Sequence, residues 1–131
     1  MDSKLFLTIL ITIFFLDIGL AKDQVMQWKN YAGNKDFVDY GGGIISFDCI
    51  KAHNQTCHAK SALNNLRQGK KIDLDLTGGK NPVKTLCFKL EGTTSVYKLV
   101  SKSKKTEETF CDFKDGSSVR VGDLWRVYLQ N

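Results

Sequence analysis

Beyond its first twenty-one residues the sequence has no long apolar run, and this absence limits what the chain can be. The one extended apolar segment spans residues 5–16 and is interrupted only by Thr8 and Thr12. A membrane-spanning helix needs roughly 20 apolar residues, so we expect no transmembrane segment once this part is removed. No cysteine stands where the segment ends, so a lipid-anchored lipoprotein is not indicated.

Two further motifs lack a required part. Gly41-Gly42-Gly43 has neither the strand–loop–helix setting nor the Lys-Ser/Thr of a phosphate-binding loop, so it predicts a flexible break. Lys98, Lys102, Lys104 and Lys105 cluster around one predicted hairpin loop. No aromatic residues lie among them to stack on bases, so nucleic acid is not a favoured partner.

Residues 1–21 have the layout of a secretory signal peptide. Lys4 supplies the positive start, the apolar segment follows, and Gly19 and Ala21 are the small residues of a cleavage site. The mature chain, residues 22–131, is therefore expected to be exported and to be periplasmic or secreted. It carries 18 basic and 12 acidic side chains, a net charge of +6, which could suit nucleic acid, anionic lipid or an acidic partner.

The mature chain is the size of one small domain, and its cysteines are expected to stabilise it. All four cysteines (Cys49, Cys57, Cys87 and Cys111) belong to it. An even number in a small exported protein indicates two disulfides. Three pairings are possible, and we favour Cys49–Cys57 with Cys87–Cys111.

The periodicity of apolar residues predicts two helices. One runs from about Thr56 to Gly69, with Ala59, Ala62, Leu63 and Leu66 on its buried face. The other begins at Asn81-Pro82, an N-cap followed by a proline in the first helical position, and ends near Gly92. Residues 22–56 show less pattern: 22–40 are expected to be irregular or a short helix, and 44–50 a strand.

The remaining segments predict strands. Residues 72–76 alternate between apolar and acidic side chains. Residues 95–101, 106–113 and 117–121 follow, with a hairpin turn at Asp115-Gly116. Residues 124–129 predict a fourth strand, with a short helix as the alternative. We therefore expect one α+β domain, with two short helices on a mainly antiparallel sheet. The Cys87–Cys111 bridge would fasten helix to sheet and stabilise the fold by roughly 3 kcal/mol.

Residues 81–129 resemble a family of small exported bacterial domains of unknown function whose members often carry the label haemolysin. The resemblance rests on Asn81-Pro82, Cys87, Gly92, the run Cys111-Asp112-Phe113-Lys114-Asp115-Gly116-Ser117, and Trp125. The chain departs from the family pattern at Val83, Glu91, Lys114 and Val119. The resemblance implies an exported domain and no particular activity.

Candidate catalytic and metal-binding residues lie between positions 49 and 58. Cys49, His53 and Cys57 recur every four residues with His58 adjacent, a spacing that could hold zinc or pair a cysteine nucleophile with a histidine base. An exported chain favours oxidised cysteines, so we expect a disulfide-closed loop with two surface histidines and neither a metal nor a cofactor.

Trp28 and the lysine cluster (Lys98, Lys102, Lys104 and Lys105) form the candidate binding surface, since aromatic anchors dominate interface energetics. The expected function is that of a non-enzymatic binding protein of the bacterial envelope or secreted fraction, such as an inhibitor or an envelope-associated factor. Its partner would be a protein or an envelope component. The alternative is a secreted cysteine/histidine- or metal-dependent enzyme or toxin that uses the segment from Cys49 to His58.

Overall fold

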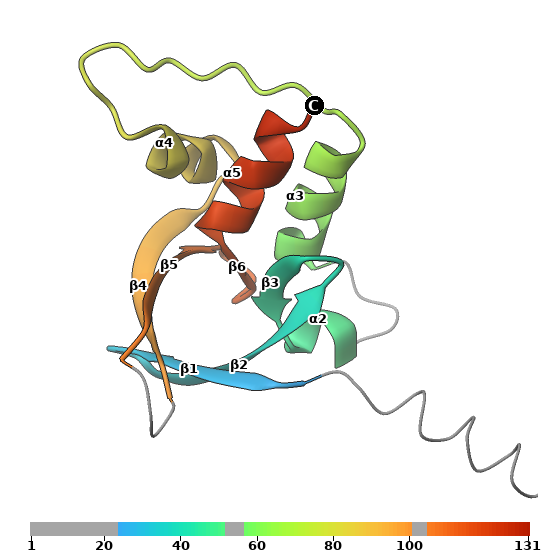
Figure 1. Cartoon of the computed structure of the whole chain (residues 1–131), viewed down its shortest axis with the longest axis vertical. Coiled ribbons are helices and arrows are strands. Elements are labelled where there is room, and N and C mark those ends of the chain that lie inside the picture. Colours follow the sequence, from blue (N-terminus) through green and yellow to red (C-terminus); the bar gives the residue numbers. More distant parts are fainter. Residues whose placement is uncertain (1–23, 52–56, 101–104) are drawn as a thin grey trace, which may run out of the picture.

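A computed structural model describes residues 24–51, 57–100 and 105–131. Its elements follow the order β1 (Met26–Asn30), β2 (Gly33–Tyr40), β3 (Gly43–Ser46), α2 (Asp48–Lys51), α3 (His58–Arg67), α4 (Pro82–Lys89), β4 (Thr93–Leu99), β5 (Glu107–Asp112), β6 (Ser118–Arg120) and α5 (Val121–Leu129). The strands are joined in the order β1-β2-β3-β6-β5-β4, and β1 also pairs with β4, so the sheet closes into a six-stranded antiparallel barrel (Figure 1).

The interior of the barrel holds a cluster of large side chains. Trp28, Phe37, Ile44, Tyr97 and Phe110 come from five different strands and are all buried. The ring of Phe110 lies 5.3 Å from that of Trp28 and 4.5 Å from that of Phe37, measured between centroids. Successive residues of a strand point to opposite faces, so the neighbours of these residues point outward.

A second core lies between the barrel and the helices. Helices α3, α4 and α5 pack on one side of the barrel, and the chain between α3 and α4 arches past their far ends (Figure 1). Leu63, Leu66, Leu86 and Leu124 of these helices pack with Ile45 and Val119 on the outer face of β3 and β6. Strands β3, β5 and β6 are therefore covered on both faces.

The structure confirms both predicted helices and both predicted disulfides. Asn81 caps α4, since its side-chain oxygen accepts from the backbone N–H groups of Val83 and Lys84. Cys49 is bonded to Cys57, and Cys87 in α4 is bonded to Cys111 in β5. The second bridge fastens a helix to the sheet, as expected. Disulfides are compatible with an oxidising compartment outside the cytoplasm.

The predicted fold class, two helices on a mainly antiparallel sheet, is wrong because the sheet is a closed barrel that dominates the fold. The error begins at residues 22–40, expected to be irregular or a short helix, because residues 26–30 and 33–40 form β1 and β2. The alternation of apolar and polar residues along β1 and β2 is hard to see in the sequence, because some residues that face the barrel interior are polar. Lys35, for example, stands two residues before the buried Phe37 on the same side of β2.

Three other segments differ from their predictions. The strand expected over 44–50 stops at Ser46 and gives way to α2. In residues 72–76, Ile72 and Leu74 pack against the helical core while Leu76 is exposed, and the segment belongs to no strand. A closed barrel has no free edge for them to join. Residues 124–129 belong to helix α5, the stated alternative, which leaves Leu129 63 % exposed.

Within the described residues, no helix combines the length and the apolar character needed to cross a membrane.

Candidate binding surface

The β2–β3 hairpin ends in a diglycine turn that two arginines contact. Gly41 and Gly42 have φ values of +59° and +90°, as two-residue hairpin turns of this kind require. Arg67 of α3 donates through Nη2 to the carbonyl oxygens of Tyr40 (2.6 Å) and Gly41 (2.8 Å). Arg126 of α5 donates through Nη2 to the carbonyl oxygen of Gly42 (2.6 Å). A side chain at position 41 would crowd this approach, since its Cβ would lie 3.1 Å from Arg67 Nη2.

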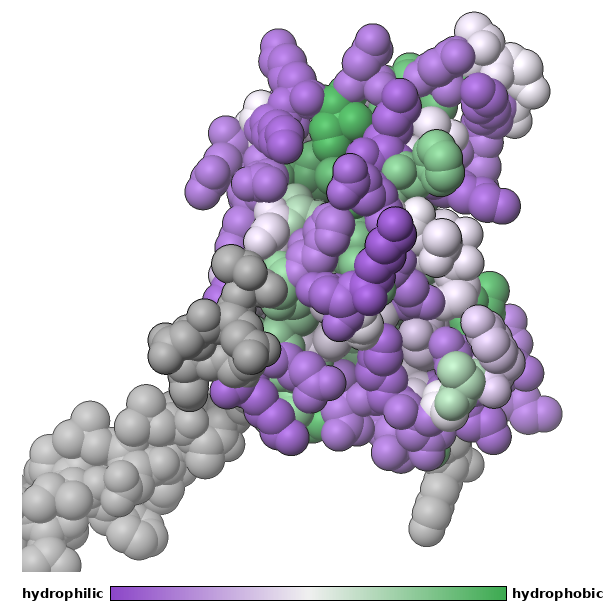
Figure 2. All heavy atoms as spheres, turned by 180° about the vertical axis from the view of Figure 1, so that it is seen from behind, coloured by the Kyte–Doolittle hydropathy of each residue, from purple (hydrophilic) through white to green (hydrophobic). Residues whose placement is uncertain are grey.

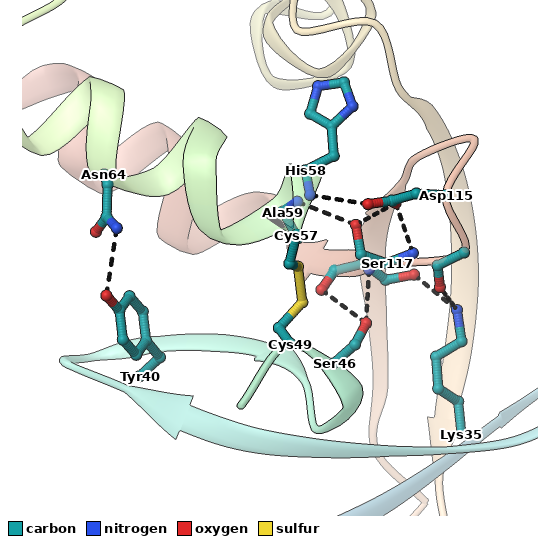
Figure 3. Close-up of a disulfide and its surroundings, with 12 residues drawn as sticks. Lys35, Tyr40, Ser46, Cys49, Cys57, His58, Ala59, Asn64, Asp115 and Ser117 are labelled. Atoms are coloured by element: carbon teal, nitrogen blue, oxygen red, sulfur yellow. Dashed lines mark hydrogen bonds between the residues drawn. A yellow bond between two sulfur atoms is a disulfide. The ribbon is translucent and has the colours of Figure 1, made fainter. Parts of the chain in front are cut away.

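Tyr40 lies beside the turn and gathers further polar groups. Its hydroxyl accepts a hydrogen bond from Asn64 Nδ2 at 3.2 Å (Figure 3). Lys60 Nζ and the guanidinium of Arg67 lie 5.5 and 5.1 Å from the centre of its ring, within the range of cation–π attraction. Lys60, Asn64 and Arg67 follow one another at i, i+4 and i+7, so they share one flank of α3.

We call Tyr40, the diglycine turn, Lys60, Arg67 and Arg126 the arginine–turn surface.

Asp123 helps to position Arg126. Its carboxylate is only 4 % exposed and accepts from Arg120 through Nε and Nη2, both at 2.9 Å, and from the backbone N–H of Ile44 at 2.8 Å. These hydrogen bonds from Arg120 to Asp123 raise the pKa of Arg120. Arg126 Nη2 adds a longer contact of 3.4 Å to the same carboxylate. Arg120 already pairs with the carboxylate of Asp123 through two hydrogen bonds. The side chain of Arg126 is half exposed, so its positive charge is left largely for an external anion.

The unoccupied donors of the two arginines determine what this surface can bind. A guanidinium has five N–H donors in a planar fork that fits a carboxylate. Within the described residues, Arg67 and Arg126 use only Nη2. Nε and Nη1 of both arginines therefore have no protein acceptor there. The surface offers fixed, cationic donors and suits binding of carboxylate groups more than catalysis.

A second polar cluster fills one end of the barrel. Lys35 Nζ donates to Ser118 Oγ (3.0 Å) and to the carbonyl oxygen of Gly116 (2.8 Å). Ser118 and Tyr97 donate to Oδ1 of Asp112, and Ser95 donates to its Oδ2. Burial raises the pKa of Tyr97, and the charge of Asp112 adds to the rise.

A lysine next to a serine hydroxyl is also found in nucleophilic enzymes. Here, however, Ser118 is 0 % exposed and its hydroxyl is committed to Asp112. Lys35 donates to a carbonyl, so in this arrangement it acts as a donor and not as a base. We assign the cluster to the packing of the barrel interior.

The segment from Cys49 to His58 does not present the thiolates that the catalytic and zinc hypotheses require. The sulfur atoms of Cys49 and Cys57 are bonded to each other. The imidazole of His58 points away from them (Figure 3) and stacks on Phe113 with 4.1 Å between ring centres. His53 lies outside the described residues. Among those that are described, no group of three or more His, Cys, Asp or Glu side chains is placed to hold a metal ion.

The Asp115–Ser117 turn explains the position of His58. Asp115 Oδ2 accepts from the backbone N–H of His58 at 2.9 Å, and Ser117 Oγ accepts from that of Ala59 at 3.0 Å (Figure 3). The residue before α3, Cys57, provides no side-chain cap. The turn therefore caps α3 from a distant part of the chain and has a structural role.

Of the predicted binding surface, the structure describes Trp28, Lys98 and Lys105. Trp28 is 4 % exposed and lies inside the barrel, so its prediction as a surface anchor is wrong. Lys98 forms an exposed ion pair with Glu107 at 3.6 Å. Lys105 is exposed, while Lys102 and Lys104 lie outside the described residues.

Tyr40, Arg67 and Arg126 were not among the residues predicted from the sequence. The polar flank of α3 was the available signal, since Lys60, Asn64 and Arg67 lie beside its predicted apolar face. Searches with the sequence and the structure found no matching protein family, curated protein or solved structure. The likeness of residues 81–129 to exported bacterial domains thus stays a prediction.

Proposed function

We propose that the protein is an exported binding protein without catalytic activity, which holds a carboxylate-rich segment of a protein partner on its arginine–turn surface. The partner would belong to the bacterial envelope or to the secreted fraction, as expected for an inhibitor or an envelope-associated factor. The observation that carries the proposal is that Arg67 and Arg126 meet at one turn with Nε and Nη1 of each unpaired within the described residues.

The distribution of charge supports an acidic partner. Residues 57–92 hold seven basic and three acidic side chains, so they account for four of the six excess positive charges of the expected mature chain. On the face seen in Figure 2, hydrophilic residues predominate and apolar residues form only small patches. Both features favour recognition by charge and hydrogen bonding, which steers association and sets specificity.

The composition of the arginine–turn surface supports a protein as the partner. Arginine and tyrosine are enriched among the residues that carry most of the binding energy at protein interfaces. Two disulfides fasten α4 to β5 and α2 to the start of α3, and a rigid scaffold loses little conformational entropy on binding.

The test compares two double variants that each remove two positive charges. Arg67→Gln with Arg126→Gln alters the arginine–turn surface, and Lys84→Gln with Lys89→Gln alters exposed lysines of α4. Each mature protein is immobilised, incubated with an envelope extract, and the captured proteins are quantified at low and high salt. We expect the arginine variant to lose an acidic partner at least tenfold and the lysine variant to retain it.

Equal loss in both variants would show that net charge alone governs capture, and unchanged capture by the arginine variant would exclude the surface. Far-ultraviolet circular dichroism controls for folding, since both arginines also contact the turn. Arg67→Lys with Arg126→Lys keeps the charge but removes the planar fork, so it should weaken capture by an intermediate amount.

A further inference from the structure

A small cavity lies between the C-terminal ends of α3 and α5. Its volume is about 260 Å³, just below the range of roughly 300–1,000 Å³ that is usual for small-molecule sites. Leu66, Ile72 and Tyr128 line its inner part, and Lys70, Lys71 and Leu129 are exposed at its rim. The cavity thus combines apolar walls with a cationic opening.

The walls of the cavity are held in place by hydrogen bonds and stacking. The hydroxyl of Tyr128 donates to the carbonyl oxygen of Ile72 at 3.2 Å, which fixes the chain after α3 against α5. The ring of Tyr128 stacks on Trp125 with 5.4 Å between centres. Asn131 Nδ2 donates to the carbonyl oxygens of Leu66 and Val127, so it joins the last turns of the two helices. A ligand would enter a preformed site.

The charge at the opening decides which ligand fits. Two helix C-termini meet here, and each carries a partial negative charge of about half a unit. Two of their carbonyl groups already accept from Asn131. Lys70 and Lys71 bring two full positive charges and form no ion pair within the described residues. The two ammonium groups at the rim attract an anion and repel a cation.

We propose that this cavity binds a small free organic acid whose carboxylate meets Lys70 and Lys71 and whose short apolar body packs on Leu66, Ile72 and Tyr128. The volume allows a body of only a few carbon atoms. The site shares no residue with the arginine–turn surface, so it is independent of the proposed function and either can fail alone. With so few ligand atoms, we expect a Kd of about 1 mM or somewhat tighter.

The test is an NMR titration of ¹⁵N-labelled mature protein with hexanoate, hexanol and hexylamine, which share a chain and differ in charge. Hexanoate should cause saturable shifts confined to the amides of residues 69–72 and 128–131, whereas binding at the arginine–turn surface would shift those of Arg67 and Arg126. Hexanol should bind at least several-fold more weakly, and hexylamine should not bind. Shifts that do not saturate, that spread over the barrel, or that are equal for all three compounds would overturn the proposal.

Two variants make the result specific to the cavity. Lys70→Gln with Lys71→Gln should weaken hexanoate about fivefold, as expected for partly exposed ion pairs, while Lys84→Gln with Lys89→Gln on α4 should leave its Kd unchanged. Leu129→Glu places a negative charge at the exposed rim and should abolish binding without disturbing the core. Unaltered binding in the first and third variants would exclude this site.

A short peptide ending in leucine, made once with a free and once with an amidated C-terminus, tests whether the cavity binds the C-terminus of a protein instead of a small free acid. The cavity as proposed binds hexanoate more tightly than either peptide. Tighter binding of the free-carboxylate peptide would overturn the assignment to a small free acid.

Discussion

Gly92 packs directly against Cys111. A Cβ atom at position 92 would overlap the Sγ atom of Cys111 and lie 3.1 Å from the Sγ atom of Cys87. The backbone N–H of Gly92 also donates to the carbonyl oxygen of Cys87 at 3.0 Å, where α4 ends. The absence of a side chain at this position is what lets the chain turn from α4 into β4 beside the disulfide.

We therefore expect Gly92→Ala to lower the free energy of unfolding by about 2 kcal/mol, as overpacking of a core usually does. Gly122→Ala is the matched control, because no atom lies within 4 Å of the added Cβ there and the residue is part of helix α5. That change should be neutral or stabilising by up to about 1 kcal/mol. Urea unfolding of both variants measures the difference, and similar values for the two would contradict this account.

At Glu91, the residue before Gly92, a change to glycine is expected to stabilise the fold. Glu91 is the one non-glycine residue with positive φ, 70°, among the described residues. It follows the last turn of α4, where its N–H donates to Phe88 O at 2.9 Å, in the position that usually holds glycine. Glu91→Gly should therefore raise the free energy of unfolding by about 1 kcal/mol. Glu91→Ala keeps the unfavourable φ, so an equal gain in that variant would show that removal of the charge was responsible.

The helices and the disulfides could be predicted from the sequence because their determinants are local or few. The apolar stripe from Ala59 to Leu66 and the Asn81-Pro82 start each lie within one or two turns of a single helix. Four cysteines allow only three pairings. The correct pairing follows once Cys87 and Cys111 are both placed in the core.

The barrel could not be predicted, because its closure depends on pairs that are distant in the sequence. Trp28 pairs with Leu99, and Ile45 pairs with Val119, which no local periodicity reveals. The polar end of the interior, with Lys35 and Ser118, also removes the apolar alternation that marks a strand. The arginine–turn surface was hidden for a similar reason, since Tyr40, Arg67 and Arg126 come from three separate elements.

The disulfides predict the result of a thiol assay. Every cysteine of the described residues is paired, so the unreduced, denatured protein should contain no reactive sulfhydryl, and the reduced protein should contain four. Titration with a chromogenic thiol reagent measures this directly. One or two free thiols in the unreduced protein would contradict the pairing and restore the hypothesis of a cysteine nucleophile.

The two disulfides should contribute unequally to stability. Their cysteines are 24 residues apart for Cys87–Cys111 and 8 apart for Cys49–Cys57. On the chain-entropy model the longer loop is worth about 3.5 kcal/mol and the shorter about 2.5 kcal/mol. All four residues are buried, so replacing each pair with alanine leaves comparable small voids. Urea unfolding of the two double variants should show the larger loss for Cys87 and Cys111, and the reverse order would contradict the model.

Asp115 makes the stability of α3 dependent on pH. Burial opposes its ionisation, but the hydrogen bonds from the Ser117 hydroxyl and from the backbone N–H groups of His58 and Ser117 outweigh this and lower the pKa of Asp115 below 3.8. A carboxyl whose pKa is lower in the folded state stabilises the fold above its unfolded pKa. This contribution is lost as the pH falls through the folded pKa.

At neutral pH, Asp115→Ala should lower the free energy of unfolding by about 1–2 kcal/mol, as loss of a helix cap does. The difference from the wild-type protein should shrink as the pH falls from about 4 to about 2, because the protonated wild-type carboxyl no longer accepts these hydrogen bonds as an anion. Asp73→Ala is the control, since Asp73 is exposed and accepts no hydrogen bond within the described residues. Urea unfolding at several pH values measures each difference. A difference for Asp115→Ala that stays constant over this range would show that the capping carboxylate is not what titrates.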